Sequence, residues 1–481
     1  MQSKDEIVQT FIRKNISLAS DRFNNYIYDE NGDQYFKRFA YIRFEKYIKD
    51  FLSGQAANRL VIVSGLRGTG KTTIVAQMHN ALLRMGVPQS HMLYVSMDEV
   101  TGMLGSSLAE IVQGYERFLT KDFETLQRQD QVFLFIDEVH YDPNWSLTLK
   151  SIFDKTRNVF MFVTGSSAIS LTTGTDVARR AQVETLFPLN YMEYNILKER
   201  TLPPTGMNEA IVNAIFYSSS AKEAYERLKE KQGTMNEYLS KIRPMRQKEY
   251  LKYGTLPFAI PFKNEQDIYE RVLSMLEKVV FQDLESIGKF NRDTQMKIMN
   301  LLTILASSDR VNYEKLSSML GMSKPTLTES INALEKADLI FKIRPHGSAS
   351  VRIQKTPKYK FTAPAIRTSL LWSIGSWKDT NEMYGSLLED VVAMYLHRFE
   401  LLKKAFSVEF DQSDNCADFI LRLRDGSDMV IEVGYGHKGT AQIYNSAAHC
   451  NMKYGVIVSN DPLGLMADDI LTVPNEIFLL S

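Results

Sequence analysis

The sequence is poor in cysteine, and this scarcity excludes several classes of protein. Its 481 residues contain two cysteines, Cys416 and Cys450. Two isolated cysteines cannot build a disulfide scaffold, and they are too few for a cysteine-based zinc site. We therefore expect two free thiols in a reducing compartment and no redox chemistry.

Long apolar runs are also missing. No stretch approaches the roughly 18 to 20 apolar residues that a membrane-crossing helix needs. The first residues, Met-Gln-Ser-Lys-Asp-Glu, lack the basic-then-apolar order of a secretory signal. The sequence thus predicts a soluble, cytoplasmic protein with no membrane partner.

The chain as a whole has no net charge, but its segments do. The 57 basic and 57 acidic residues cancel, which argues against a generic polyanion binder. Residues 289–360, however, hold 13 Lys/Arg against 6 Asp/Glu, whereas residues 361–481 hold 9 against 16. This contrast indicates separate modules with separate partners.

The remaining composition is that of a folded globular protein, with 44% hydrophobic, 11% aromatic and 24% charged residues. The length is about three times the ~150 residues of one domain. We therefore expect two to four domains.

A glycine-rich segment between a strand and a helix carries the strongest functional signal. Residues 60–64 are a buried-strand pattern, residues 65–72 read Gly-Leu-Arg-Gly-Thr-Gly-Lys-Thr, and residues 74–83 have helical periodicity. Glycines let successive N–H groups curl around phosphates, and the helix N-terminus adds positive potential. The sequence therefore predicts a P-loop for ATP and Mg²⁺. The expected nucleotide contacts are Gly65, Arg67, Gly68, Thr69, Gly70, Lys71, Thr72 and Thr73.

Two acids follow the next strongly apolar strand. Residues 132–136 lead directly into Asp137 and Glu138, about 65 residues beyond the P-loop. We expect Asp137, with Thr72, to bind Mg²⁺ and Glu138 to activate the attacking water as general base, with Lys71 assisting at the phosphates.

Hydroxyl side chains end a further strand at residues 158–163, in the sequence Thr-Gly-Ser-Ser at 164–167. The end of this strand lies where a γ-phosphate is sensed in such folds, which makes Ser166 a candidate contact. A plain turn is the alternative.

Further motifs lie along the first part of the chain: Tyr-Ile-Arg at 41–43 before a helix, the strand at 93–98, Trp145 after the acid pair, 164–167, 186–194 and 250–257. In this order they resemble one family, the bacterial and archaeal AAA+-type ATPases with a C-terminal domain of restriction-endonuclease-like fold. This resemblance implies a five-stranded core, a small helical lid, and an arginine region at Arg179 and Arg180 that reaches phosphate, with Arg67 as a rival.

The basic segment has the pattern of a winged helix-turn-helix. Helical periodicity covers 296–306, 313–320 and 324–337, and two short strands are expected at 339–343 and 351–353. Six basic and no acidic residues lie at 339–360, which favours DNA binding. A packing or protein-contact module is the open alternative. The third helix is expected to expose Lys324, Thr326, Thr328 and Glu329.

The last segment resembles the nuclease-like domain of the same family. A helix is expected at 387–396 and a hairpin with an Asp-Gly turn at 416–433. The resemblance implies that Glu389, Asp418 and Glu432 hold a divalent ion.

One position departs from that family. Its members place a lysine two residues after the last carboxylate, on the same face of the strand. Here that place is Gly434, and the nearest lysine is Lys438. We expect cleavage to be weak or absent, although a migrated lysine and a degenerate domain both explain this sequence.

We therefore expect an α/β protein with a P-loop NTPase core and four further parts. Its predicted activity is Mg²⁺-dependent ATP hydrolysis coupled to DNA engagement. A nucleotide switch that controls assembly with a protein partner is the alternative, and a homo-oligomer is open. The expected parts are an N-terminal helical segment at 1–40, the AAA+-type core at 41–189, the lid at 190–288, the winged helix at 289–360 and the nuclease-like α/β domain at 361–481.

Overall fold

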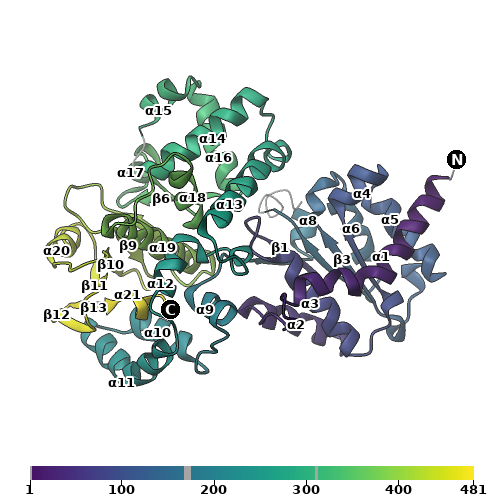
Figure 1. Ribbon diagram of the computed structural model, residues 1–481, viewed down its shortest axis with the longest axis horizontal. Coiled ribbons are helices and arrows are strands. Elements are labelled where there is room, and N and C mark those ends of the chain that lie inside the picture. The colour runs from purple at the N-terminus through teal and green to yellow at the C-terminus, as the bar shows by residue number, and fades with distance from the viewer. Residues whose placement is uncertain (1–2, 167–174, 309–311) are drawn as a thin grey trace. The chain divides into compact units, whose positions relative to one another are not determined.

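The computed structural model describes residues 3–166, 175–308 and 312–481 (Figure 1). The chain forms two compact units. Most of the segment expected as a lid lies in the second unit. The first unit comprises Met1–Phe187, Gln282–Lys289 and Lys336–Asp338, and the second comprises Pro188–Phe281, Phe290–Glu335 and Leu339–Ser481.

The first unit is built on a five-stranded sheet in which every pair of neighbours is parallel. The predicted five-stranded core is confirmed. Parallel pairing aligns the carboxyl ends of the strands along one edge, where the glycine-rich loop follows β1. The order is β2 (Met92–Ser96), β3 (Val132–Asp137), β4 (Val159–Thr164), β1 (Leu60–Ser64) and β5 (Gln182–Thr185).

Helices cover both faces of this sheet (Figure 1). Successive side chains of a strand point to opposite faces, so Val61 packs in one apolar cluster with Phe44, and Ile62 packs in the other with Ile111. Strand β1 is thus held between two buried apolar layers, which position the loop that follows it. The helices are α1 (Lys4–Ile27), α2 (Phe39–Leu52), α3 (Lys71–Arg84), α4 (Met97–Leu104), α5 (Leu108–Leu119), α6 (Trp145–Lys155) and α8 (Thr175–Ala178).

The second unit begins with helices and ends with a mixed sheet. A π-helical turn, Tyr250–Gly254, extends α12. Among the described residues no helix is both long and apolar enough to span a membrane. The helices are α9 (Tyr191–Glu199), α10 (Met207–Tyr217), α11 (Ala221–Ser240), α12 (Arg246–Glu249), α13 (Glu265–Phe281), α14 (Arg292–Ser307), α15 (Tyr313–Leu320), α16 (Lys324–Lys336), α17 (Ala349–Gln354), α18 (Ala365–Ser373), α19 (Asn381–Leu401), α20 (Ala441–Ala447) and α21 (Asn475–Phe478).

The eight-stranded sheet of this unit contains strands from both the expected winged helix at 289–360 and the expected nuclease-like domain at 361–481. Strand β6 pairs with β7 on one side and, in parallel, with β8 on the other. The expected hairpin with an Asp-Gly turn is present as β9 and β10. The order is β12 (Gly464–Ala467), β13 (Ile470–Pro474), β11 (Met452–Ser459), β10 (Asp428–Val433), β9 (Phe419–Arg422), β8 (Ser407–Phe410), β6 (Ile340–Pro345) and β7 (Lys358–Phe361).

Two local predictions are wrong. Residues 351–353 lie in helix α17, which Ser348 begins by accepting the N–H of Val351, and the partner strand of β6 is β7 instead. The motif at 41–43 lies inside helix α2 rather than before a helix. In the first case a side-chain cap decides the local structure over β-branched residues.

Candidate functional site

The glycine-rich loop has a backbone that only glycine adopts readily. Gly65, Gly68 and Gly70 have φ of 152°, 86° and 91°. A Cβ on Gly65 would lie 2.4 Å from the carbonyl oxygen of Leu186. The loop is thus pressed against the chain after β5 and enters α3 directly after Gly70.

Lys71 is buried at the first position of α3, with 6% of its surface exposed. Its Nζ donates to the carbonyl oxygens of Gly65 at 2.9 Å and Leu66 at 3.2 Å. Burial lowers the pKa of this lysine, and the carboxylates of Asp137 and Glu138 oppose that effect. The loop therefore holds a cation inside its own curve.

Asp137 ends β3 and meets the P-loop helix. Its Oδ2 accepts a hydrogen bond from Thr72 Oγ1 at 2.7 Å, and its Oδ1 accepts one from Thr164 Oγ1. A hydroxyl and a carboxylate are the hard oxygen donors that Mg²⁺ prefers. Thr72 and Asp137, the two predicted Mg²⁺ ligands, are thus brought together and fit that ion.

Glu138 follows in a left-handed conformation, with φ of 50°. Burial, and then the adjacent charge of Asp137, raise its pKa to about 7. A carboxyl with such a pKa is suited to accept a proton near neutral pH.

His140 is a neighbour of Glu138 that the sequence gave no reason to select. Its Nδ1 lies 3.5 Å from Glu138 Oε2. Burial lowers the pKa of this imidazole to about 4, so it is neutral beside the acid.

Ser166 lies just beyond β4, at the same edge of the sheet. It is 8% exposed, and its Oγ has no hydrogen-bond partner among the described residues. A buried hydroxyl left without a partner fits a site for a phosphate oxygen. Ser167, the second serine of that motif, lies outside the described residues.

The three candidate arginines have defined partners. Arg67 Nη1 contacts both carboxylate oxygens of the buried Asp283, at 3.0 and 3.1 Å. Arg179 pairs with Asp176 at 2.5 Å. The sequence did not predict the Asp283 contact, because more than two hundred residues separate the partners. Arg180 makes two contacts with Asp154, at 2.7 and 3.0 Å.

In the second unit, three carboxylates lie within electrostatic reach of one another. Burial raises the pKa of Asp418 to about 8, and the charges of Glu389 and Glu432 add to this shift. The N–H of Val433 donates to Asp418 Oδ2 at 2.9 Å. Glu432 is fully buried, and its Oε2 has no hydrogen-bond partner among the described residues.

Lys438 returns to the place that Gly434 leaves open. Its Nζ donates to Glu432 Oε1 at 2.6 Å. A Cβ built on Gly434 would lie 2.2 Å from Lys438 Cε and 2.9 Å from its Cγ. The lysine stem thus occupies the space where a side chain at 434 would begin.

A further lysine, which the sequence analysis assigned to a basic surface, enters this site from β7. Lys360 is fully buried, and its Nζ lies 2.9 Å from Glu389 Oε1 and 3.1 Å from Asp390 Oδ1. Arg367 also pairs with Asp390. Burial of a lysine requires such acidic partners.

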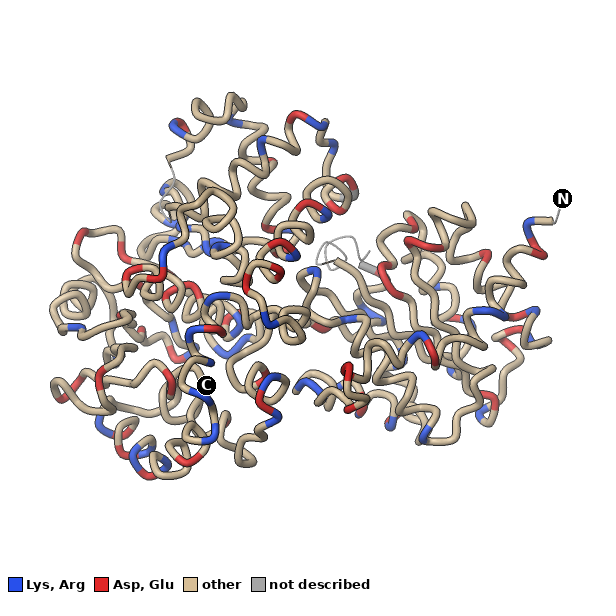
Figure 2. The backbone as a smooth tube through the Cα atoms, in the orientation of Figure 1, with Lys and Arg blue, Asp and Glu red and all other residues tan. Residues whose placement is uncertain are grey.

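Figure 2 marks every described Lys and Arg along the backbone. In the segment at 339–360, fewer of these charges are free than the sequence suggests. Lys358 and Lys360 are buried, whereas Arg344 and Lys355 are exposed. On helix α16, Thr326 is half-buried, and Lys324, Thr328 and Glu329 are exposed as expected. The other two cations are ion-paired, Lys342 with Glu335 at 2.8 Å and Arg352 with Glu409 at 3.0 Å.

Two family matches cover parts of the chain. Residues 57–195 match an AAA domain (AAA_14), and residues 245–375 match a domain of unknown function (DUF8612). The first match contains the P-loop, Asp137, Glu138 and Ser166. This part of the chain is a P-loop ATPase-like AAA domain.

Similar proteins are known from archaea and bacteria. The chain is 32% identical over 446 residues to the uncharacterized protein MJ1637 of Methanocaldococcus jannaschii, with 92% of this chain and 89% of that protein covered. It is 22% identical over 396 residues to an uncharacterized protein of Haemophilus influenzae, with 80% and 85% covered.

Two solved structures have low similarity to the chain. The Walker-type ATPase PABY2304 of Pyrococcus abyssi gives a TM-score of 0.41 at 13% identity, with 70% of this chain and 95% of that chain covered. The Aeropyrum pernix ORC1 protein, solved in complex with DNA, gives a TM-score of 0.31 at 13% identity, with 69% and 91% covered.

Proposed function

Because the chain belongs to the same family as MJ1637 of Methanocaldococcus jannaschii and contains an AAA domain, we propose that it hydrolyses ATP with Mg²⁺ and couples this reaction to DNA. The observation that carries the ATPase proposal is the convergence of Lys71, Thr72, Asp137 and Glu138 at one edge of the parallel sheet.

Each residue has a role that follows from its contacts. Mg²⁺, held by Thr72 and Asp137, would neutralise charge on the phosphates. Lys71 would bind phosphate oxygens in place of its two carbonyl acceptors, and the unpaired Ser166 hydroxyl would donate to the γ-phosphate. Glu138 would orient the attacking water and accept its proton.

Phosphate release from ATP tests this part. The purified protein should release phosphate with Mg²⁺ and stop when EDTA is added. Asp137→Asn should lower the rate and shift the half-saturating Mg²⁺ concentration upward, while Asp130→Asn, an acid before the same strand, should behave like the wild type. Release that is indifferent to EDTA would overturn the Mg²⁺ assignment.

The coupling to DNA rests on Arg344 and Lys355, the exposed cations of the segment at 339–360, and on the exposed Lys324 of α16, which pairs with Glu314 at 2.8 Å. Cations on a helix and its neighbouring hairpin neutralise DNA phosphates. Two buried and two ion-paired cations in the same segment favour the second candidate, a nucleotide switch with this segment as a packing or protein-docking element.

One experiment separates these two functions. ATP hydrolysis is measured with and without duplex and single-stranded DNA, alongside DNA affinity at several salt concentrations. Stimulation together with salt-sensitive affinity supports coupling to DNA. An unchanged rate with no salt-sensitive binding supports the switch.

We also propose, from the same family resemblance, that the protein forms a homo-oligomer. In it, Arg179 or Arg180 of one chain would contact the phosphates of the nucleotide bound to a neighbouring chain. Turnover per chain that rises with protein concentration, and falls in Arg180→Ala, supports this role. Turnover that is independent of concentration removes the need for it.

We further propose that the second unit cleaves a phosphodiester with a divalent metal. The position of Lys438 over Gly434 favours this candidate, because it supplies a cation beside the carboxylates, as the migrated lysine left open by the sequence would. Glu389, Asp418 and Glu432 would hold the ion, and the unpaired Oε2 of Glu432 fits a ligand. A bound divalent cation would stabilise attack on the phosphorus by offsetting developing charge.

Cleavage of supercoiled and linear DNA with Mg²⁺ or Mn²⁺ tests this second candidate. Asp418→Ala should abolish cutting while ATP hydrolysis continues. A matched control is Asp425→Ala, in the exposed turn between β9 and β10. If the wild-type protein leaves both DNA forms intact, the domain is a degenerate nuclease that does not cut.

A further inference from the structure

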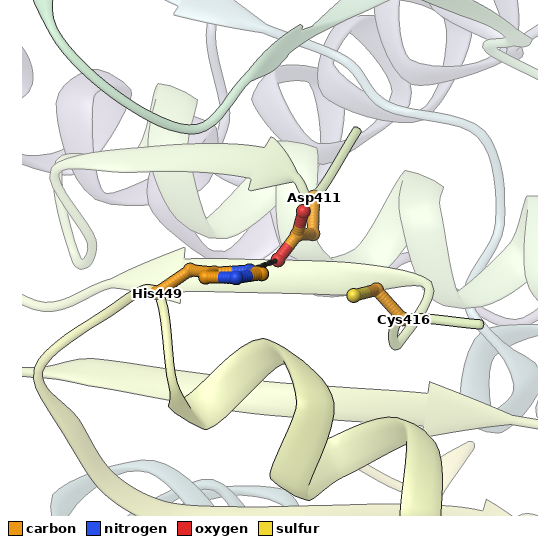
Figure 3. Close-up of side chains that lie close together, drawn as sticks. All are labelled: Asp411, Cys416 and His449. Carbon is orange, nitrogen blue, oxygen red and sulfur yellow. Dashed lines mark hydrogen bonds and ion pairs between the residues drawn. The ribbon is translucent and has the colours of Figure 1, made fainter. Parts of the chain in front are cut away.

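A third cluster of side chains lies in the second unit and takes no part in either proposed reaction. It consists of Asp411, Cys416 and His449 (Figure 3). Each offers one ligand atom, and these three atoms all lie within 4.8 Å of one another. An oxygen, a sulfur and a nitrogen donor thus converge on one point.

Asp411 is oriented by its own turn. It directly follows β8, and its Oδ1 accepts the N–H of Ser413 at 2.9 Å. Its other oxygen, Oδ2, accepts a hydrogen bond from His449 Nδ1 at 2.7 Å. One carboxylate oxygen is therefore fixed by backbone while the other points into the cluster.

Helix α20 holds the loop that carries Cys416. Asn445 Nδ2 donates to the carbonyl of Asn415 at 2.8 Å, and Gln442 Nε2 donates to that of Cys416 at 3.3 Å. Ser446 Oγ accepts the N–H of Ala417 at 2.9 Å. The thiol is thus positioned by three contacts from one helix.

The same helix positions the histidine. His449 lies just beyond the end of α20, and its N–H donates to the carbonyl of Ser446 at 3.0 Å. Its side chain is 50% exposed, whereas that of Asp411 is 7% exposed. Hydrogen bonds thus hold the cluster on its protein side, and it is open to solvent at the histidine.

We propose that Asp411, Cys416 and His449 form a binding site for a divalent transition metal, with Zn²⁺ as the best match. Thiolate and imidazole ligands select Zn²⁺ over Mg²⁺ and Ca²⁺, which prefer oxygen alone. Three protein ligands with a solvent-facing side leave a fourth, tetrahedral position for water or another ligand.

This proposal revises the expectation that two cysteines are too few for a zinc site. One cysteine suffices when histidine and carboxylate complete the set. Sequence spacing does not reveal the set, because 38 residues separate Asp411 from His449. Both cysteines are nonetheless free of disulfide bonds, as predicted.

The chain provides matched controls. His437 pairs with Asp461 as His449 pairs with Asp411. The second cysteine, Cys450, is next to His449 in sequence but outside the cluster. Substitutions at His437 and Cys450 thus change the same residue types without removing a proposed ligand.

The experiment is a titration of the metal-free full-length chain with Co²⁺, followed by displacement with Zn²⁺. A thiolate-to-cobalt charge-transfer band should saturate at one Co²⁺ per chain, and Zn²⁺ should abolish it. The all-oxygen Mg²⁺ sites proposed above cannot produce this band. Cys416→Ser should remove the band and weaken Zn²⁺ by ~100-fold or more, beyond the 10–100-fold typical of outer-shell changes. His437→Ala and Cys450→Ser should retain both.

Three results would overturn the proposal: no band in the wild-type chain, an intact band in Cys416→Ser, or loss of the band in Cys450→Ser. Far-UV circular dichroism checks that each variant is folded. If Cys416→Ser does not fold, His449→Asn serves instead, and it should keep the band but shift the visible cobalt spectrum and weaken Zn²⁺. An unchanged spectrum and affinity in His449→Asn would count against the site.

Discussion

The two sites proposed to act on phosphates use lysine and carboxylates in opposite ways. In the first unit, Lys71 donates to two backbone carbonyls of its own loop. In the second unit, Lys438 donates directly to the carboxylate of Glu432. Lys71 is buried whereas Lys438 is partly exposed, and only the second has an acid as its immediate partner.

This difference suits each site to a different first ligand. A lysine that neutral carbonyls hold keeps its charge for an incoming polyanion such as a nucleotide. A lysine that an acid holds is already neutralised, while burial, with the added charges of Glu389 and Glu432, raises the pKa of Asp418 to about 8. The second site therefore favours a cation before it accepts a phosphate.

The substitution Lys71→Ala is expected to have the largest effect on this contrast. Losing two charge-assisted contacts to phosphate, each worth roughly 1.5–3 kcal/mol, should weaken ATP binding by ~100-fold or more. Isothermal titration with ATP measures this loss. Lys49→Ala, an exposed lysine on α2, is the control and should bind as the wild type does. Equal affinity in Lys71→Ala would mean that the buried cation does not contact phosphate.

Glu138→Gln should keep ATP bound but slow its hydrolysis by about 10²–10⁴-fold, the usual contribution of a general base. Because the pKa of Glu138 is raised to about 7, the deprotonated base should increase between pH 6 and 8. Wild-type kcat/KM should therefore rise about tenfold over this range. The residual rate of Glu138→Gln should lack that rise, and a normal rate would place the base elsewhere.

For the second site, Lys438→Ala should lower metal-dependent DNA cleavage by about 100-fold, within the range for a group that stabilises the transition state. Gly434→Lys in the Lys438→Ala background should restore part of it. At 434 the close neighbours are atoms of the flexible Lys438 side chain, and removing them opens the space. Rescue supports a migrated lysine, whereas a double variant as inactive as Lys438→Ala assigns that lysine to structure.

The smallest expected effect concerns the exposed cations Arg344 and Lys355. Replacing both by alanine should weaken DNA binding a few-fold and reduce the slope of log affinity against log salt by up to about 1.8, for two phosphate contacts. Fluorescence anisotropy at several salt concentrations measures both quantities. Lys231→Ala with Lys241→Ala on α11 is the control and should leave the slope unchanged.

The first site was predictable because its residues are contiguous or end strands of the same parallel sheet. Gly65 to Thr72 form one motif, and Asp137 ends a strand whose apolar run is plain in the sequence. Parallel strands then bring both to one edge without any further information. The contact of Arg67 with Asp283 escaped prediction because it depends on a distant turn.

The second unit was less predictable because tertiary burial overrides local character. Lys360 reads as a surface cation in a basic segment, yet Glu389 and Asp390 stabilise it in the interior. Lys438 reaches Glu432 only because the chain turns back after Gly434. Neither the burial of the first nor the turn of the second has a signature in periodicity or spacing.

The continuous sheet of the second unit links helix α16 to the carboxylate cluster of Asp418 and Glu432. Strand β6 follows α16 and pairs with β8, and β8 neighbours the hairpin of Asp418 and Glu432. Arg352 to Glu409 and Lys360 to Glu389 add ion pairs across the same junction. If DNA binds at α16, the continuous sheet would keep a constant distance between the bound segment and the carboxylates. Cleavage would then occur at a fixed number of base pairs from the bound sequence.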